Sequence, residues 1–156
     1  MNLKQIAIEK LNKRGVTLEQ MAQLALELQI KYDSSLTIKD CLNALEMVLE
    51  KREVTHAILT GIAIDEAVEK NLFDEEINSI IKDDKPLYGI DEILALSIVN
   101  VYGSIALTNF GYLDKLKPGI VGEVDKLGKE KNGCSTFLDD IVGALVAATV
   151  SRIAHK

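Results

Sequence analysis

Adjacent carboxylates stand at the start of the two most apolar stretches in the second half of the chain. Asp91 and Glu92 precede the uncharged run 93–113, and Asp139 and Asp140 open the run that ends near residue 154. Burying a charged side chain is unfavourable unless an opposite charge pairs with it, and a divalent cation is one such partner. These residue types at these positions predict a site for a hard metal ion.

A third segment, residues 114–119, adds groups that suit a phosphate. Asp114 and Lys117 flank a turn that closes with Pro118 and Gly119, so a carboxylate and an ammonium are expected to project from one constrained segment. Carboxylates without His or Cys suit Mg²⁺ or Mn²⁺, and a lysine suits a phosphate oxygen. Together these groups predict metal-assisted hydrolysis of a phosphate ester, in which the metal activates water.

Two further aspartates stay open as members of this site. Asp65 lies on the apolar face of a helix expected near residues 54–70, where it either binds the metal or caps a neighbouring helix. Asp125 follows the lysine segment, and its spacing does not decide its role. His56 is about half a helical rotation from Asp65, so it is interpreted as a surface residue rather than as part of the site.

Each acidic pair also has a purely structural explanation. An aspartate is a favoured N-cap, and acids in a first turn complement the helix dipole, which would account for Asp91. Thr136, with Asp139 three residues later, resembles a capping box. A cap uses one acid, however, so the second acid of each pair must point elsewhere. For Lys117 the structural explanation is a solvated loop lysine.

The rest of the chain has the pattern of amphipathic α-helices. Aromatic residues make up only 4% of the sequence, and Leu, Ala, Ile, Glu and Lys are abundant, which favours an all-α fold. Thr17, with Gln20, and Thr37 mark helix starts, and Gly15 marks a helix end. Helices are expected to begin near residues 3, 17 and 37 and to cover about 54–70, 74–82, 93–113 and 136–154.

These elements predict one helical domain over residues 1–156, with about six to seven helices around a buried apolar central helix. The central helix is the uncharged run 93–113, which Gly111 is expected to end. Its length would span a bilayer. Polar residues dilute it, however, and no basic cluster flanks it, so no transmembrane segment is expected.

Composition narrows the class of protein further. The net charge is −6, and no basic block interleaves with aromatics, which argues against a nucleic-acid partner. Cys41 and Cys134 are far apart, and no signal peptide is visible, so we expect reduced thiols in a cytoplasmic protein. No arginine-rich phosphate loop follows Cys134, so it is interpreted as structural.

The second half of the chain resembles the phosphatidylglycerophosphatase A family. The resemblance covers residues 89–150, and three segments in the same order and spacing carry it: Asp91-Glu92-Ile93-Leu94, Phe110-Gly111-Tyr112-Leu113-Asp114-Lys115-Leu116-Lys117-Pro118-Gly119-Ile120 and Phe137-Leu138-Asp139-Asp140-Ile141-Val142-Gly143-Ala144. The chain departs from the family pattern at Ala95, where a glycine is usual, and at Gly111, where an arginine is frequent. Soluble helices replace the family's glycine- and proline-rich N-terminal segment.

The resemblance implies Mg²⁺-dependent hydrolysis of phosphatidylglycerophosphate to phosphatidylglycerol. It implies that the catalytic residues are Asp91, Asp114 and Asp139 and that Lys117 contacts the substrate phosphate. It further implies that Mg²⁺ or Mn²⁺ binds to the carboxylates of Asp91, Glu92, Asp114, Asp139 and Asp140.

Several alternatives remain open from the sequence. The substrate is either phosphatidylglycerophosphate or a soluble phosphate ester. A helical binding module that keeps the fold without the chemistry is one alternative function. The other is an all-α nucleotide pyrophosphohydrolase, a class that carries Glu-x-x-Glu and Glu-x-x-Asp pairs on facing helices. The apolar helices are also compatible with a homodimer and with peripheral contact to a membrane.

Overall fold

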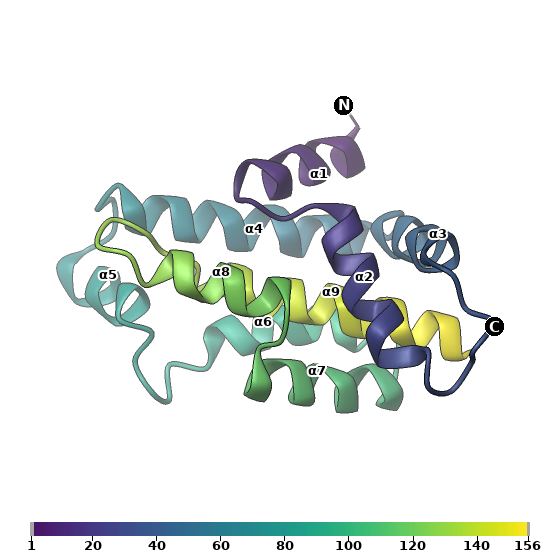
Figure 1. Cartoon of the computed structure of the whole chain (residues 1–156). Helices are drawn as coiled ribbons and strands as arrows, with labels where there is room; N and C mark the ends of the chain where they lie inside the picture. The colour runs from purple at the N-terminus through teal and green to yellow at the C-terminus, as the bar shows by residue number, and fades with distance from the viewer. Residues whose placement is uncertain (1, 156) are drawn as a thin grey trace.

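Nine α-helices form the regular structure of residues 2–155, the part of the chain that the computed structural model describes. In chain order they are α1 (Leu3–Lys13), α2 (Leu18–Gln29), α3 (Ile38–Leu49), α4 (Arg52–Glu69), α5 (Glu75–Lys82), α6 (Ile90–Val99), α7 (Ser104–Leu116), α8 (Ile120–Gly128) and α9 (Thr136–Ala154). The predicted all-α fold is confirmed. In Figure 1, α9 runs through the middle of the bundle, with α4 above it and α7 below.

The helix buried at the centre of the bundle is α9. Every residue from Thr136 to Ser151 is buried. The helix packs against α2, α3, α4, α6, α7 and α8. A helix that is apolar on all sides needs such a complete surround. The bundle therefore holds the first turns of α9, with their two aspartates, inside the protein.

Capping side chains start two N-terminal helices where the sequence predicts. The Thr17 hydroxyl accepts the N–H of Gln20 at 3.2 Å, and the Gln20 side chain accepts the N–H of Thr17 at 2.8 Å. Thr37 and Asp40 form the same reciprocal pair at the start of α3. Gly15, with a φ of 84°, follows the end of α1 as predicted. These local signals work because each cap is complete within four residues.

The prediction of one central helix over residues 93–113 is wrong. Helix α6 ends at Val99 and α7 begins at Ser104, with Gly103 in the turn at a φ of 86°. Gly111 lies inside α7 rather than at a helix end. Both helices cover α9 and expose their outer sides, so the uncharged run forms part of the surface and not the centre.

The helix count also differs from the expected six to seven. The division of the expected central helix into α6 and α7 adds one helix. Helix α8 adds a second, which the sequence pattern did not predict. The segment 114–119 is only partly a turn: Asp114 belongs to the last turn of α7, and Lys117 is its C-cap in a left-handed conformation. Within residues 2–155, no helix is both long enough and apolar enough to cross a membrane.

Candidate functional site

The first turn of α9 is buried, so its backbone N–H groups need partners within the protein. Asp65, from the interior of α4, supplies them. Its Oδ1 accepts the N–H of Phe137 at 3.1 Å, and its Oδ2 accepts the N–H of Leu138 at 2.9 Å. Burial raises the pKa of Asp65 to about 7, whereas both N–H donors favour its charged form. Of the two roles open for Asp65, the structure gives it the helix cap.

The capping box expected between Thr136 and Asp139 is not formed. The N-cap of α9 is Ser135, which makes no side-chain cap hydrogen bond. The Thr136 hydroxyl instead donates to the carbonyl of Ile81 at 2.5 Å. The cap comes from another helix, and this leaves the Asp139 carboxylate available to other partners.

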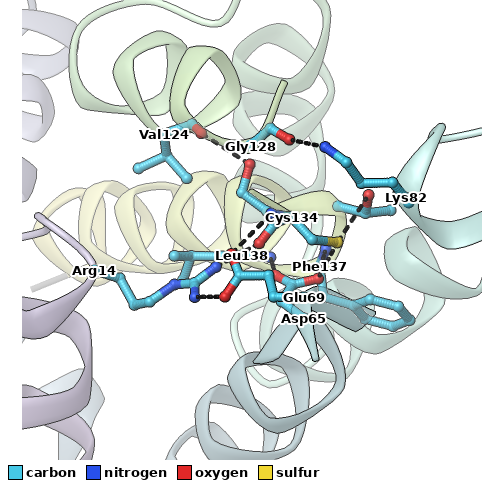
Figure 2. Close-up of polar contacts among 11 residues, drawn as sticks. Arg14, Asp65, Glu69, Lys82, Val124, Gly128, Cys134, Phe137 and Leu138 are labelled. Carbon is cyan, nitrogen blue, oxygen red and sulfur yellow. Dashed lines mark hydrogen bonds and ion pairs between the residues drawn. The ribbon is translucent and has the colours of Figure 1, made fainter. Parts of the chain in front are cut away.

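An ion pair between Arg14, the C-cap of α1, and Glu69, the last residue of α4, fixes the segment that leads into α9 (Figure 2). Arg14 Nη1 lies 2.7 Å from Glu69 Oε1, and Arg14 Nη2 donates to the Cys134 carbonyl. Glu69 Oε2 accepts the N–H of Cys134 at 2.8 Å. Sequence reasoning missed this pair, because residues so far apart in the chain share no local pattern.

A lysine forms hydrogen bonds with the end of α8, near the segment that leads into α9. Lys82 Nζ donates to the carbonyl of Gly128 at 3.1 Å (Figure 2). It also donates to the carbonyl of Glu130 at 2.8 Å. Ser135 Oγ donates to the carbonyl of Val124 at 2.8 Å. The loop between α8 and α9 is thus held at both ends, which fixes where the first turn of α9 begins.

Cys134 is a structural residue of this junction. Its thiol is buried and donates to Asp65 Oδ1 at 3.4 Å. Burial, together with the neighbouring Asp65 charge, raises the pKa of Cys134 to about 11. A thiol in this state is a poor nucleophile, which agrees with the structural interpretation of Cys134.

Four aspartates from three helices meet beside one lysine, and we call this group the acid cluster: Asp91 of α6, Asp114 of α7, Asp139 and Asp140 of α9, and Lys117. The Asp140 carboxyl is in hydrogen-bond contact with those of Asp91 and Asp114. Asp91, Asp139 and Asp140 are 7%, 3% and 4% exposed. The structure therefore brings together residues that the sequence predicted as one site.

Lys117 is the counter-ion of the acid cluster. Its Nζ lies 3.2 Å from Asp139 Oδ2 and 3.5 Å from Asp114 Oδ1. Burial alone would lower the pKa of Lys117, but the Asp139 carboxylate outweighs that effect and raises it above its usual range. Lys117 is therefore a fixed cation that is about a third exposed, not a solvated loop lysine.

One ammonium cannot balance four carboxylates. Burial, the Asp139 charge and the contacts with Asp91 and Asp114 raise the pKa of Asp140 far above its usual value. Burial also raises the pKa of Asp139, although Lys117 opposes the shift. The cluster must therefore retain a proton or take up further positive charge at neutral pH.

Three other acidic residues lie at the edge of the acid cluster. Glu92 is exposed, and burial, Asp114 and Asp91 raise its pKa. Asp125 pairs with Lys129 at 3.1 Å and adds negative charge near Asp139. Asp84, which sequence reasoning treated only as part of a helix-breaking segment, also contributes to the local field: burial and the Asp91 charge raise its pKa.

The donor chemistry of the acid cluster fits Mg²⁺ or Mn²⁺, because every candidate ligand is a carboxylate oxygen and the cluster is short of positive charge. Within residues 2–155, no group of three or more His, Cys, Asp or Glu side chains is already arranged to hold a metal ion. The Lys117 ammonium lies between Asp139 and Asp114. An ion bound there would compete with that ammonium, so the carboxylates would have to turn towards it.

A cavity of about 640 Å³ lies beside the loop that precedes α9 and not at the acid cluster. Its lining includes Arg14, Glu69, Cys134 and Leu138, but none of the acid cluster residues. The acid cluster instead reaches solvent through Asp114 and Lys117, whose side chains are 31% and 29% exposed. A substrate would therefore meet the acid cluster at the protein surface.

Comparison with known protein families matches this chain to one family. The sequence profile of phosphatidylglycerophosphatase A matches residues 7–155. The Bacillus subtilis protein YpjQ is 54% identical over 150 residues, which cover 96% of this chain and 83% of YpjQ. A second Bacillus subtilis protein, YutG, is 48% identical over 147 residues, which cover 94% of this chain and 87% of YutG.

Solved structures of proteins that are about as similar in sequence have the same fold as this chain. The crystal structure of YpjQ superposes with a TM-score of 0.91 at 53% identity and covers 98% of this chain and 93% of that one. The low temperature requirement C protein of Listeria monocytogenes gives a TM-score of 0.93 at 50% identity and covers 99% of this chain and 96% of that one. These relatives share the whole helical arrangement described above.

We predict that Asp65→Ala lowers the free energy of unfolding by about 2–4 kcal/mol, because it removes a helix cap and leaves two buried N–H groups unpaired. Asp74→Ala is the matched control, since Asp74 precedes α5 without a side-chain cap bond, and it should change stability by less than about 0.5 kcal/mol. Urea unfolding followed by circular dichroism measures both. Equal stabilities for the two variants would contradict the capping role.

Proposed function

The chain belongs to the phosphatidylglycerophosphatase A family, and from this premise we propose that it is a Mg²⁺- or Mn²⁺-dependent phosphatase. Its substrate would be a phosphate monoester, either phosphatidylglycerophosphate or a soluble phosphate. The observation that supports this most is the contact of Asp140 with Asp91 and Asp114, with Lys117 held beside them. A metal-dependent phosphatase needs negative ligands for the metal and benefits from a cation that binds the phosphate, and the acid cluster offers both.

The metal ligands we propose are the carboxylates of Asp91, Glu92, Asp114, Asp139 and Asp140. When bound, the ion would activate water and offset the charge that develops on the phosphoryl oxygens. The three nearly buried aspartates are held by α6 and α9, so their positions are set by helix packing rather than by a loop. Glu92 is the exposed member and would act at the edge of the site.

Lys117 would bind a phosphate oxygen as a point charge. Its ion pairs with Asp139 and Asp114 hold the ammonium at the mouth of the acid cluster. The backbone there is also fixed, because a Cβ on Gly122 would lie 2.4 Å from the Lys117 carbonyl oxygen. This close approach places the Lys117 backbone directly against the first turn of α8.

The catalytic carboxyl groups we propose are those of Asp91, Asp114 and Asp139. An ionised carboxylate can accept the proton of the attacking water, and a carboxyl group with a raised pKa can hold a proton for the departing alcohol oxygen. Burial raises the pKa of Asp139 and Asp140, so the acid cluster offers carboxyl groups of the second kind.

One observation favours a binding module without catalysis as the second candidate. Gly111 lies one turn before Asp114 in α7, where the family frequently has an arginine. An added Cβ at Gly111 would meet nothing within 4 Å. The chain thus lacks a second phosphate-binding cation at an open position, and Lys117 is left as the cation of the site.

We predict that millimolar Mg²⁺ or Mn²⁺ raises the melting temperature of the protein, because an ion that binds the folded state alone stabilises it. Asp91→Asn combined with Asp139→Asn should abolish that rise. Asp74→Asn combined with Asp83→Asn, both at exposed positions, is the control and should keep it. Differential scanning calorimetry with and without metal measures these melting temperatures. An unchanged melting temperature for the wild type would rule out the metal site.

We predict metal-dependent release of phosphate from phosphatidylglycerophosphate or a soluble phosphomonoester. Asp114→Asn should reduce the rate by at least about a hundredfold, because it removes both a ligand and a catalytic carboxylate. Lys115→Ala, at the exposed neighbouring position, should retain activity. A phosphate assay over lipid and soluble esters tests this. Pyrophosphate released from nucleoside triphosphates would instead indicate the pyrophosphohydrolase.

We predict that Gly111→Arg lowers KM for the phosphate ester by roughly three- to tenfold, because a guanidinium would join Lys117 at the phosphate. The change should also be tolerated, since Gly111 is exposed and arginine is a better helix former. Gly111→Gln is the control of similar length without charge. Equal KM values for both variants would show that this position does not face the substrate.

A further inference from the structure

The cavity of about 640 Å³ beside the loop that precedes α9 has no part in the proposed hydrolysis. The ends of α1, α4 and α8 and the start of α9 form its walls. Its lining shares no residue with the acid cluster. Cavities of this size are typical of sites for small organic molecules. The chemistry of the lining indicates which kind of molecule fits.

The loop between α8 and α9 forms one wall of this cavity, and close packing fixes its shape. A Cβ on Gly128 would overlap Ser135 Oγ, and a Cβ on Gly133 would lie 2.5 Å from the Leu127 carbonyl oxygen. Neither position therefore accepts a larger residue without a shift of its neighbours. The N–H of Gly133 also donates to the Glu130 carbonyl at 3.0 Å. A wall that is already ordered lowers the entropy lost when a ligand binds.

Basic side chains around the cavity have unused hydrogen-bond donors. Lys13 and Lys131 both line it, and neither forms an ion pair with any other residue of 2–155. Arg14 also lines it, with a side chain that is 18% exposed. Two of its five N–H groups bond to Glu69 and to the Cys134 carbonyl, which leaves three for a ligand (Figure 2). Such donors suit a negatively charged acceptor.

The acidic residues nearby do not cancel these donors. Both oxygens of Glu69 are already bonded, one to Arg14 and the other to a backbone N–H. Glu130 is exposed at the rim. Asp65 and Glu66 also lie near Arg14, but they do not line the cavity. The lining therefore carries three basic and two acidic side chains, in a chain whose net charge is −6.

Apolar side chains complete the lining. Leu127 is 50% exposed and lies close to the end of α1, because a Cβ on Gly15 would be 3.9 Å from its Cδ1. Val124 and Leu138 add further apolar surface. An inorganic ion would leave this surface uncovered. A molecule with both an apolar part and an anionic group would contact both kinds of lining.

We propose that this cavity binds a small organic molecule that carries an oxyanion, either a phosphoryl or a carboxylate group. Lys13, Lys131 and Arg14 would hold the oxyanion, and Leu127 would contact the apolar part. The proposal does not depend on the proposed function, because the acid cluster takes no part in it. A ligand in the cavity would touch the Arg14–Glu69 pair, which fixes the segment before α9.

Titration of the ¹⁵N-labelled protein with phenylphosphonate, followed by NMR, tests the proposal, with EDTA present to keep metal out of the acid cluster. The amide signals of Gly15, Gly128 and Gly133 should shift and saturate together, because these residues line the cavity. Benzoate replaces phenylphosphonate in a parallel titration, and the tighter probe identifies the preferred oxyanion. Sulfate at the same ionic strength should bind at least about tenfold more weakly, because it lacks the apolar part.

The lysines of the cavity are tested by a pair of double variants. Lys13→Ala with Lys131→Ala should weaken phenylphosphonate binding about tenfold or more, because two cations at the oxyanion are lost. Both positions are exposed, so the fold should persist. Lys39→Ala with Lys51→Ala changes the net charge equally at exposed positions outside the cavity. This control should bind phenylphosphonate as the wild type does.

Three results would overturn the proposal. The first is the absence of saturating shifts at Gly15, Gly128 and Gly133 with millimolar phenylphosphonate or benzoate. The second is equal weakening by the two double variants, which would indicate general charge screening. The third is a set of shifts confined to Gly89 and Gly119, next to the acid cluster. Binding at the cavity by a protein without phosphatase activity would support the proposal and refute only the proposed function.

Discussion

The buried first turn of α9 is the constraint on which the other features of this protein depend. A helix start that is closed to water must receive hydrogen bonds for its N–H groups, and Asp65 provides two of them. Arg14 and Glu69 then hold the preceding residue, Cys134, in place. Since this end of the helix is fixed, the carboxylates of its next residues enter the interior, where only a proton, a lysine or another cation can balance them.

Local signals in the sequence were enough to predict the helices that start and end by themselves. Thr17 and Thr37 form the capping boxes that their spacing indicated. The limits of α9, residues 136 and 154, agree with the prediction because an apolar run between polar residues has clear ends. The meeting of Asp91 and Asp139 in one cluster followed from charge burial, since neither stretch could pack without a partner for its acids. The chemistry that they perform stays a prediction.

The sequence predictions were wrong or incomplete where contacts between residues far apart in the chain, or the exposure of an apolar segment, determined the structure. The uncharged run 93–113 satisfies the pattern of a buried helix, but Gly103 interrupts it and the two halves lie at the surface. The spacing of Thr136 and Asp139 predicts a capping box at the start of α9 that does not form, whereas Asp65 supplies the cap from 72 residues away. A capping role was one of the two left open for Asp65, but the sequence does not show which helix it caps. The pairing of Arg14 with Glu69 spans 55 residues and leaves no trace in local spacing. Contacts of this kind become visible only once the helices are packed.

The two buried thiols make local opening of the folded protein measurable by chemical labelling. Cys41 in α3 and Cys134 before α9 are 0% and 1% exposed, so an alkylating reagent reaches either one only when the packing around it loosens. Because the Cys134 thiol bonds to Asp65, its labelling reports release of the junction that caps α9. Labelling of Cys41 reports a separate part of the bundle. The rates of the two reactions distinguish local release of the site from unfolding of the whole chain.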